Sequence, residues 1–176
     1  QDFIVVDAHN DVIIESILTG KDISKRLRTG HTDIPRLKEG GVDVQVFAVW
    51  SDDKKYPVGK AFAHANAQID ALEAVLAKNK ASIGLAKNSS DIENLIADGK
   101  IAALIGIEGG NMIEGSIDKL QQLYDRGARY LTLTWNYNLP WATAAALEVK
   151  SSSHKNKGLS DHGKDIIRAM NAMGMM

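Results

Sequence analysis

The sequence predicts an α/β fold of the (β/α)8 TIM-barrel type, of which this chain supplies the N-terminal half. Strand-like and helix-like segments alternate along its 176 residues, which implies a parallel sheet with right-handed crossovers. An open doubly wound sheet fits the alternation equally well. Polar candidate residues follow several separate strands, however, and barrel enzymes build their sites at the carboxyl ends of strands. A full barrel usually takes about 250 residues, so we expect strands 1–4 and the start of a fifth.

Four segments rich in apolar or β-branched residues predict buried strands: residues 3–8, 43–50, 101–107 and 129–135. Residues 82–86 predict a short additional strand. The last three residues, Gly174-Met175-Met176, predict the entry to a further strand. We therefore expect the natural polypeptide to continue as an apolar strand. The isolated 176-residue chain is then expected to associate or to expose an apolar face, because open sheet edges invite pairing.

Helices are predicted between the strands, at residues 12–18, 59–78, 90–97, 117–124 and 160–173. The segment from Ser90 to Glu93 has the form of a capping box. Thr32 or Asp33 is expected to cap a short helix that has Pro35 in its first turn. Residues 148–158 are polar and predict a loop. Neither a repeat nor a linker interrupts the sequence, so we predict a single domain over residues 1–176.

Composition limits the classes of function. Apolar residues make up 44% of the chain and charged residues 24%, as in ordinary globular proteins. The net charge of −1 and the lack of a dense basic run argue against a nucleic-acid partner. No apolar stretch approaches the roughly 20 residues of a membrane span. The chain has no cysteine, so a metal ion would have to be held by His and carboxylates. The compartment stays open, whether exported, membrane-associated or cytoplasmic.

His9-Asn10-Asp11, after the first predicted strand, is the most informative local pattern. Residues two apart on a strand point to the same face, so His9 and Asp11 are expected to project together. An imidazole beside a carboxylate forms half of a metal site. The same pair could instead be a hydrogen-bonded His–Asp couple without a metal.

Glu108 directly follows the third long strand and precedes Gly109-Gly110. A carboxylate at a strand end, followed by glycines that allow close approach, suits a metal bridge. A turn in which the Glu side chain caps a backbone amide is the alternative. Polar and aromatic residues after the fourth strand are expected at the same rim as candidate substrate contacts: Asn136, Asn138 and Trp141. The other histidines are expected to be structural or surface residues: His31, His64, His154 and His162.

Five segments together resemble the membrane dipeptidase (renal dipeptidase) family, within the metal-dependent amidohydrolase-like barrels. In chain order they read DAHND, HTDIPRLKEGGVDVQVFAVW, AALIGIEGG, LYDRGARYLTLTWNYNLPWA and GLSDHGKDIIRAMNAMGMM. The resemblance implies a zinc-dependent dipeptidase that cleaves the amide bond of dipeptides through a metal-bridging hydroxide. It implies that His9, Asp11 and Glu108 are metal ligands, with Glu108 the catalytic bridge between two zinc ions. A homo-oligomer is compatible with it.

Two departures from the family pattern matter. Family members often carry a His after the segment LTLT, where this chain has Trp135. The chain also ends before the later histidines and carboxylate that would complete the site, so we expect it to bind one zinc ion or none and to be inactive by itself. Trp135, Asn138 and Trp141 are expected to contact substrate. A non-catalytic remnant or binding module on a partial barrel, and another metal-dependent amide hydrolase, are the alternatives.

Overall fold

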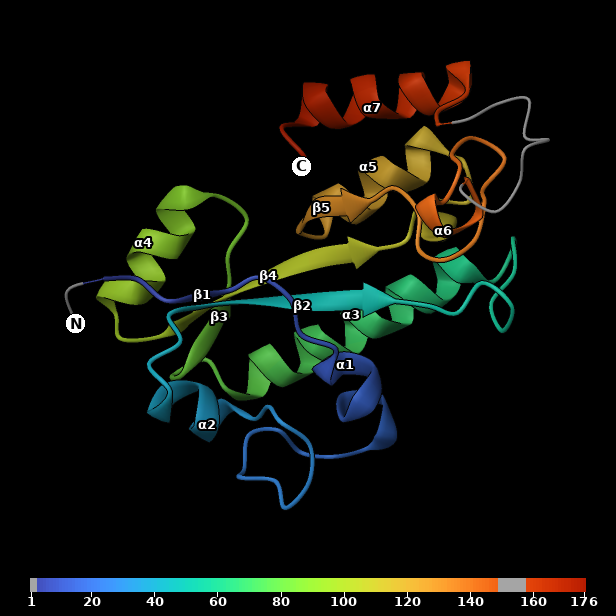
Figure 1. Cartoon of the computed structure of the whole chain (residues 1–176). Helices are drawn as coiled ribbons and strands as arrows, with labels where there is room; N and C mark the ends of the chain where they lie inside the picture. Colours follow the sequence, from blue (N-terminus) through green and yellow to red (C-terminus); the bar gives the residue numbers. More distant parts are fainter. Residues whose placement is uncertain (1–2, 149–157) are drawn as a thin grey trace. The chain divides into compact units, whose positions relative to one another are not determined.

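The computed structural model describes residues 3–148 and 158–176 (Figure 1). Its strands form one five-stranded sheet: β1 (Val6–Asp7), β2 (Val44–Trp50), β3 (Ile83–Leu85), β4 (Ile101–Glu108) and β5 (Ala128–Thr132). The order is β1-β2-β4-β3, and β5 also pairs with β4. The β1–β2 and β3–β4 pairs are parallel. This parallel α/β arrangement confirms the predicted fold class.

The described residues also contain seven α-helices and two short 3-10 helices. They are α1 (Val12–Glu15), η1 (Ile17–Thr19), α2 (Ile34–Glu39), α3 (Ala61–Lys78), α4 (Ser89–Ala97), η2 (Gly110–Ile113), α5 (Ile117–Asp125), α6 (Ala145–Glu148) and α7 (Asp161–Met173). Asp33 caps α2 as predicted, because its side chain accepts a hydrogen bond from the Arg36 N–H. Ser160 caps α7 in the same way through the Gly163 N–H.

The predicted start of α4 was wrong by one residue, and the predicted cap, Ser90, was wrong by two. The helix begins at Ser89, and the Asn88 side chain accepts a hydrogen bond from the Asp91 N–H. Asp91 in turn accepts one from the Lys87 N–H at 2.8 Å. Asparagine is a strong cap. The bond to Asp91 comes from Lys87, the residue before the cap, whereas in a capping box it would come from the cap residue itself.

The prediction that residues 3–8 form a buried strand was also wrong. β1 holds two residues, and three apolar side chains before its end are largely exposed: Phe3 (71%), Ile4 (58%) and Val6 (56%). β1 is the end member of the strand order, so only β2 pairs with it in the described part of the chain. An apolar run indicates a strand, but burial needs a second neighbour or a covering layer.

The predicted fourth long strand is shorter than expected, since β5 ends at Thr132 instead of Trp135. The predicted entry to another strand is supported by the last residue. The Met176 N–H donates to the Arg129 carbonyl at 3.0 Å, and the Met176 carbonyl accepts from the Leu131 N–H at 2.8 Å. This alternation is that of a parallel ladder beside β5. Residues 149–157, most of the predicted 148–158 loop, lie outside the described residues.

The chain divides into two compact units. The first contains the residues up to Val49 and Ala67–Gly106, and α4 packs there against β3. Gly84 allows this contact, because a Cβ at that position would lie 2.6 Å from a Leu95 methyl group.

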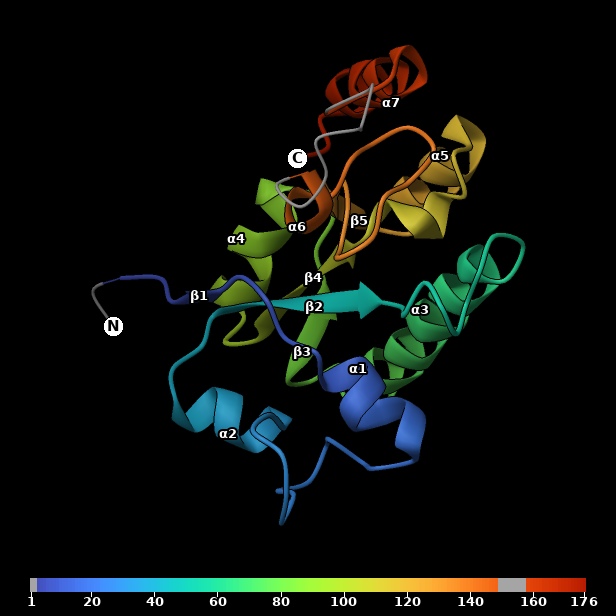
Figure 2. The same cartoon turned by 45° about the vertical axis from the view of Figure 1, so that its right-hand side comes forward.

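The second unit contains Trp50–Asn66 and the residues from Ile107 onward. In it, α5 packs against β5 and α7 (Figure 2). Its buried side chains include Met112, Leu120, Leu123 and Ile166. None of the helices in the described segments is long and apolar enough to cross a membrane.

Candidate metal centre

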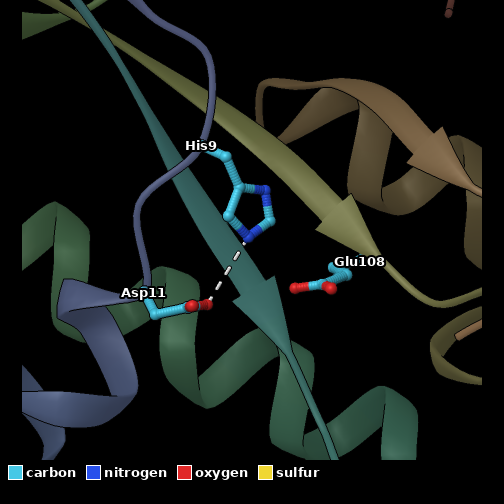
Figure 3. A group of neighbouring side chains, drawn as sticks. All are labelled: His9, Asp11 and Glu108. Carbon is cyan, nitrogen blue, oxygen red and sulfur yellow. Dashed lines mark ion pairs between the residues drawn. The ribbon is translucent and has the colours of Figure 1, made fainter. Parts of the chain in front are cut away.

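His9 and Asp11 lie in the turn between β1 and α1. The Nε2 atom of His9 is 3.6 Å from Oδ1 of Asp11, and each side chain is 43% exposed (Figure 3). Strand alternation is not what brings them together, because β1 ends at Asp7. Asp11 occupies the cap position of α1, yet its side chain makes no cap hydrogen bond. The Asp11 carboxylate is therefore not used to cap the helix.

Asn10, between the two candidate ligands, fixes the turn from three sides. Its Oδ1 accepts from the Val12 N–H at 2.9 Å, and its Nδ2 donates to Thr32 Oγ1 at 2.6 Å. Its carbonyl accepts from the Ala48 N–H in β2 at 2.9 Å. These bonds join the turn to its own helix, to the segment before α2 and to the sheet. No local pattern in the sequence indicates this positioning role, since two of the three partners are distant along the chain.

Glu108 is the last residue of β4. The two glycines after it are required by close contacts. A Cβ at Gly109, whose φ is +110°, would lie 2.5 Å from Asn111 Oδ1. A Cβ at Gly110 would lie 2.4 Å from the Trp141 ring. The glycines thus allow the chain to turn sharply while Glu108 remains at the strand end.

One ligand atom from each of His9, Asp11 and Glu108 lies within 4.8 Å of the others (Figure 3). Figure 3 shows the three side chains turned toward a common space. Imidazole nitrogen and carboxylate oxygen are donors that suit zinc and related divalent ions. The chemistry of this donor set therefore fits a metal ion, and Glu108 offers a second oxygen that could reach another ion.

Trp135 lies beside Gly109, the residue that follows Glu108. A Cβ at Gly109 would lie 3.7 Å from the Trp135 Cβ. The Trp135 ring packs edge-to-face on Trp50, at 5.0 Å between centroids, and on Tyr137, at 5.8 Å. These contacts hold an aromatic cluster of Trp50, Trp135 and Tyr137 beside the turn that follows Glu108.

Asn138 and Trp141 both have structural contacts and both line a cavity of about 410 Å³. The Asn138 Oδ1 accepts from the Ala144 N–H at 2.8 Å. Trp141 is 3% exposed, and its carbonyl accepts from the Ser160 N–H at 3.0 Å. Their contact with substrate stays a prediction.

The other histidines have structural surroundings where they are described. His64 stacks on Tyr56 at 3.7 Å, and burial, then the nearby Lys55 charge, lowers its pKa. His162 Nε2 lies 2.6 Å from the Gly115 carbonyl. His31 is exposed and lines a hollow of about 250 Å³ that His9 and Asp11 also line. His154 lies outside the described residues.

Glu114 is a buried acid that sequence reasoning missed. Its side chain is 5% exposed and pairs with Lys119. Its Oε1 accepts from the Gly59 N–H at 2.8 Å and the Phe62 N–H at 3.2 Å, at the start of α3. Burial acts to raise its pKa, but the bonds from Lys119, Phe62 and Gly59 outweigh it, so the pKa lies below its ordinary value.

Comparison with known proteins assigns the family. The model of the membrane dipeptidase family, peptidase family M19, matches residues 1–176. The chain belongs to this family. It is 31% identical over 195 aligned positions to an uncharacterized dipeptidase of Schizosaccharomyces pombe, covering 99% of this chain and 45% of that protein. The chain thus spans about half the length of this curated relative.

Solved structures show the same fold at low identity. Dipeptidase AC, a metallo peptidase of family M19, superposes with a TM-score of 0.84 at 21% identity, over all of this chain and 56% of that one. A metallo peptidase from Rhodobacter sphaeroides, liganded with a phosphinate mimic of the dipeptide L-Ala-D-Ala, gives 0.82 at 20% identity, over all of this chain and 58% of that one. The probable dipeptidase PvdM from Pseudomonas aeruginosa gives a TM-score of 0.86 at 18% identity, over 99% of this chain and 46% of that one. The fold is therefore the barrel type of this family, over about half its length.

Proposed function

We propose that the natural protein is a zinc-dependent dipeptidase whose first metal ligands are His9, Asp11 and Glu108. The single observation that carries this proposal is the set of three donor atoms within 4.8 Å of one another. Membership of a dipeptidase family supports dipeptides as the substrates. All three residues lie in the segments by which the sequence resembles that family.

Each ligand has a distinct role in this proposal. His9 supplies a neutral imidazole nitrogen, and Asp11 supplies one carboxylate oxygen. Glu108 presents two oxygens and so can bridge two cations. When bound, a pair of zinc ions would activate water and polarise the scissile amide carbonyl. The hydrogen bonds of Asn10 hold the turn that carries His9 and Asp11, which orients these two ligands.

On the substrate side, we propose that Trp135, Asn138 and Trp141 contact the dipeptide. An indole can offer an apolar wall and one N–H donor, but it has no acceptor and cannot transfer a proton near neutral pH. Trp135 beside the turn after Glu108 would therefore favour apolar side chains. This is also the observation that favours a second candidate, a metal-dependent hydrolase of a different amide, since related enzymes often carry histidine at this position.

The test is Glu108→Gln in the full-length natural protein, with Glu93→Gln as the matched control at an exposed position on α4. A neutral amide is a poor bridge between cations, so Glu108→Gln should lower kcat for dipeptide hydrolysis at least ~100-fold. This loss should exceed the one that follows mutation of a residue that only supports a metal ligand. Glu93→Gln should leave kcat unchanged. Zinc content measured by plasma mass spectrometry should fall with activity on chelation. Dipeptide turnover that survives both chelation and Glu108→Gln would contradict the proposal.

A further inference from the structure

The cavity of about 410 Å³ contains an acidic group whose charge has no counterion among the residues described. Most of its wall is apolar or aromatic and comes from residues 56–58 and 137–141, with Val58 77% exposed. Asp53 also lines the cavity, and its Oδ1 is buried without a hydrogen-bond partner. An unpaired carboxylate at an apolar wall is costly unless a ligand compensates it.

The neighbouring Asp52 shows that the loop itself does not need Asp53. The Asp52 Oδ1 accepts from the Lys54 N–H at 2.9 Å, and its carbonyl accepts from the Tyr56 N–H at 2.8 Å. Asp52 therefore organises the turn after β2. Burial first, and then the Asp52 charge, raises the pKa of Asp53, and its own backbone N–H offsets only part of this. No cation among the described residues contributes to this shift.

The two adjacent lysines contact aromatic rings of the cavity wall, and no ion pair between either of them and Asp53 is found among the described residues. Lys54 Nζ lies 5.2 Å from the centroid of the Tyr137 ring, and Lys55 Nζ lies 5.4 Å from that of Tyr56. Both are cation–π contacts. The other charged group in the wall, Glu114, is neutralised by Lys119. Asp53 is thus the acid of this cavity that the described protein leaves uncompensated.

A second acceptor lines the same cavity. Asn111 is 8% exposed, and its Nδ2 donates to Ser51 Oγ at 3.0 Å. Its Oδ1 has no hydrogen-bond partner in the described residues. Gly110 and Asn111, which line the cavity, follow Glu108 by two and three positions in the sequence. A ligand that suits it has several donors at one end and an apolar body at the other.

We propose that this cavity binds a primary ammonium group carried on an apolar or aromatic body, with Asp53 as its counterion. An ammonium carries three donors, which suits the Asp53 carboxylate and the Asn111 oxygen, and the aromatic wall covers the body. If the protein is a dipeptidase as proposed, the amino-terminal residue of the dipeptide supplies both the ammonium group and the apolar body; this identification of the ligand rests on the proposed function. A free arylalkylamine has the same chemistry.

The test is calorimetric titration of the full-length natural protein with benzylammonium and with its neutral counterpart, benzyl alcohol. Charge-assisted hydrogen bonds predict that benzylammonium binds about 10–100-fold more tightly. Asp53→Asn should remove this preference, whereas Asp52→Asn, the same charge change one residue away, should retain it. Asp53→Asn should stay folded, because it removes an uncompensated charge, and urea unfolding checks this. Equal affinity for the amine and the alcohol, or a preference that survives Asp53→Asn, would overturn the proposal.

A competition arm identifies the source of the ammonium group. Displacement of benzylammonium by phenylalanyl-alanine, but not by its N-acetyl form, supports the dipeptide amino terminus. Asp53-dependent binding that the dipeptide does not displace supports the cavity as a site for a separate amine. The titrations are repeated on Glu108→Gln, which should bind the amine normally. Failure of the dipeptidase proposal and failure of the amine-site proposal can therefore be distinguished by these titrations.

Discussion

Glu114 and Asp53 line the same cavity, yet the protein treats the two acids in opposite ways. The Glu114 carboxylate has Lys119 and two backbone N–H groups around it, and its pKa is lowered. Asp53 has a buried oxygen without a partner, and its pKa is raised. Glu114 joins η2 to the start of α3, so its charge serves the fold. The Asp53 charge has no counterion among the described residues, so it is available for a ligand.

The same contrast separates Asp33 from Asp11, two acids at helix cap positions. Asp33 is fully buried, accepts from the Leu27 and Arg36 N–H groups, and pairs with the Arg36 side chain. Asp11 makes no cap bond and faces His9. An acid that stabilises the fold can therefore be identified by its bonds from backbone N–H groups and its pairing with a cation. The Asp11 side chain, by contrast, makes no cap bond to its helix.

The largest expected effect on stability comes from Glu114→Gln. The substitution leaves the Lys119 ammonium without its counterion and weakens the bonds to the start of α3, so we expect a loss of about 1–3 kcal/mol in the free energy of unfolding. Asp53→Asn should change it by less than about 0.5 kcal/mol or stabilise the protein. Urea unfolding of both variants at neutral pH measures the difference. Equal losses would mean that the two acids are not distinguished by their partners.

The dependence of stability on pH should have opposite signs for the two acids. The pKa of Glu114 is below its ordinary value of 4.5, so the folded state binds fewer protons there than the unfolded state. Its contribution is complete above that value and is lost as pH falls through the folded-state pKa. The pKa of Asp53 is above its ordinary 3.8, so its contribution to stability falls as pH rises through the folded-state pKa.

Urea midpoints measured from about pH 3.5 to about pH 7 check these signs. The difference between wild type and Glu114→Gln should shrink toward the acid end of the range. The stability of Asp53→Asn relative to wild type should increase toward the neutral end of the range. Parallel curves for all three proteins would contradict the assignment of opposite shifts.

The sequence predicted the fold where local pattern decides it. The apolar run of β4 was placed within one residue, because this central strand is buried along most of its length. The run before β1 looked similar but is exposed, because burial depends on neighbours that a linear pattern does not contain. Trp135 was predicted to be a strand residue, but β5 ends at Thr132, and the Trp135 ring packs on Trp50, the last residue of β2.

The candidate site was predictable to the extent that its residues lie in short motifs. His9, Asp11 and Glu108 stand in such segments, whereas the partners of Glu114 lie 55 and 52 residues away. Nothing in Ser51-Asp52-Asp53-Lys54 distinguishes the acid that builds the turn from the acid that faces the cavity. Only the hydrogen bonds of the folded chain make that distinction.

Asn10→Ala should weaken the metal site more than the fold. Alanine removes the Val12 and Thr32 bonds that fix the turn, while His9 and Asp11 themselves stay unchanged. Loss of such supporting contacts typically costs 10–100-fold in metal affinity, and we expect about 10-fold here. Zinc competition titration of the full-length protein measures it. Asn136→Ala, at an exposed position that follows β5, is the control. An unchanged zinc affinity would show that the turn is held without Asn10.

Trp135→His should have the smallest effect, a shift in substrate preference and not a loss of folding. Histidine removes the apolar wall beside Gly109 and the edge-to-face contact with Trp50, and it adds a group that can accept a hydrogen bond. Because one apolar contact discriminates side chains by about 10-fold, we expect the ratio of kcat/KM for phenylalanyl over glycyl dipeptides to fall by that factor. Trp135→Phe, which keeps an aromatic ring, should retain most of the preference. An unchanged ratio in Trp135→His would remove Trp135 from the substrate pocket and leave the aromatic cluster with a packing role alone.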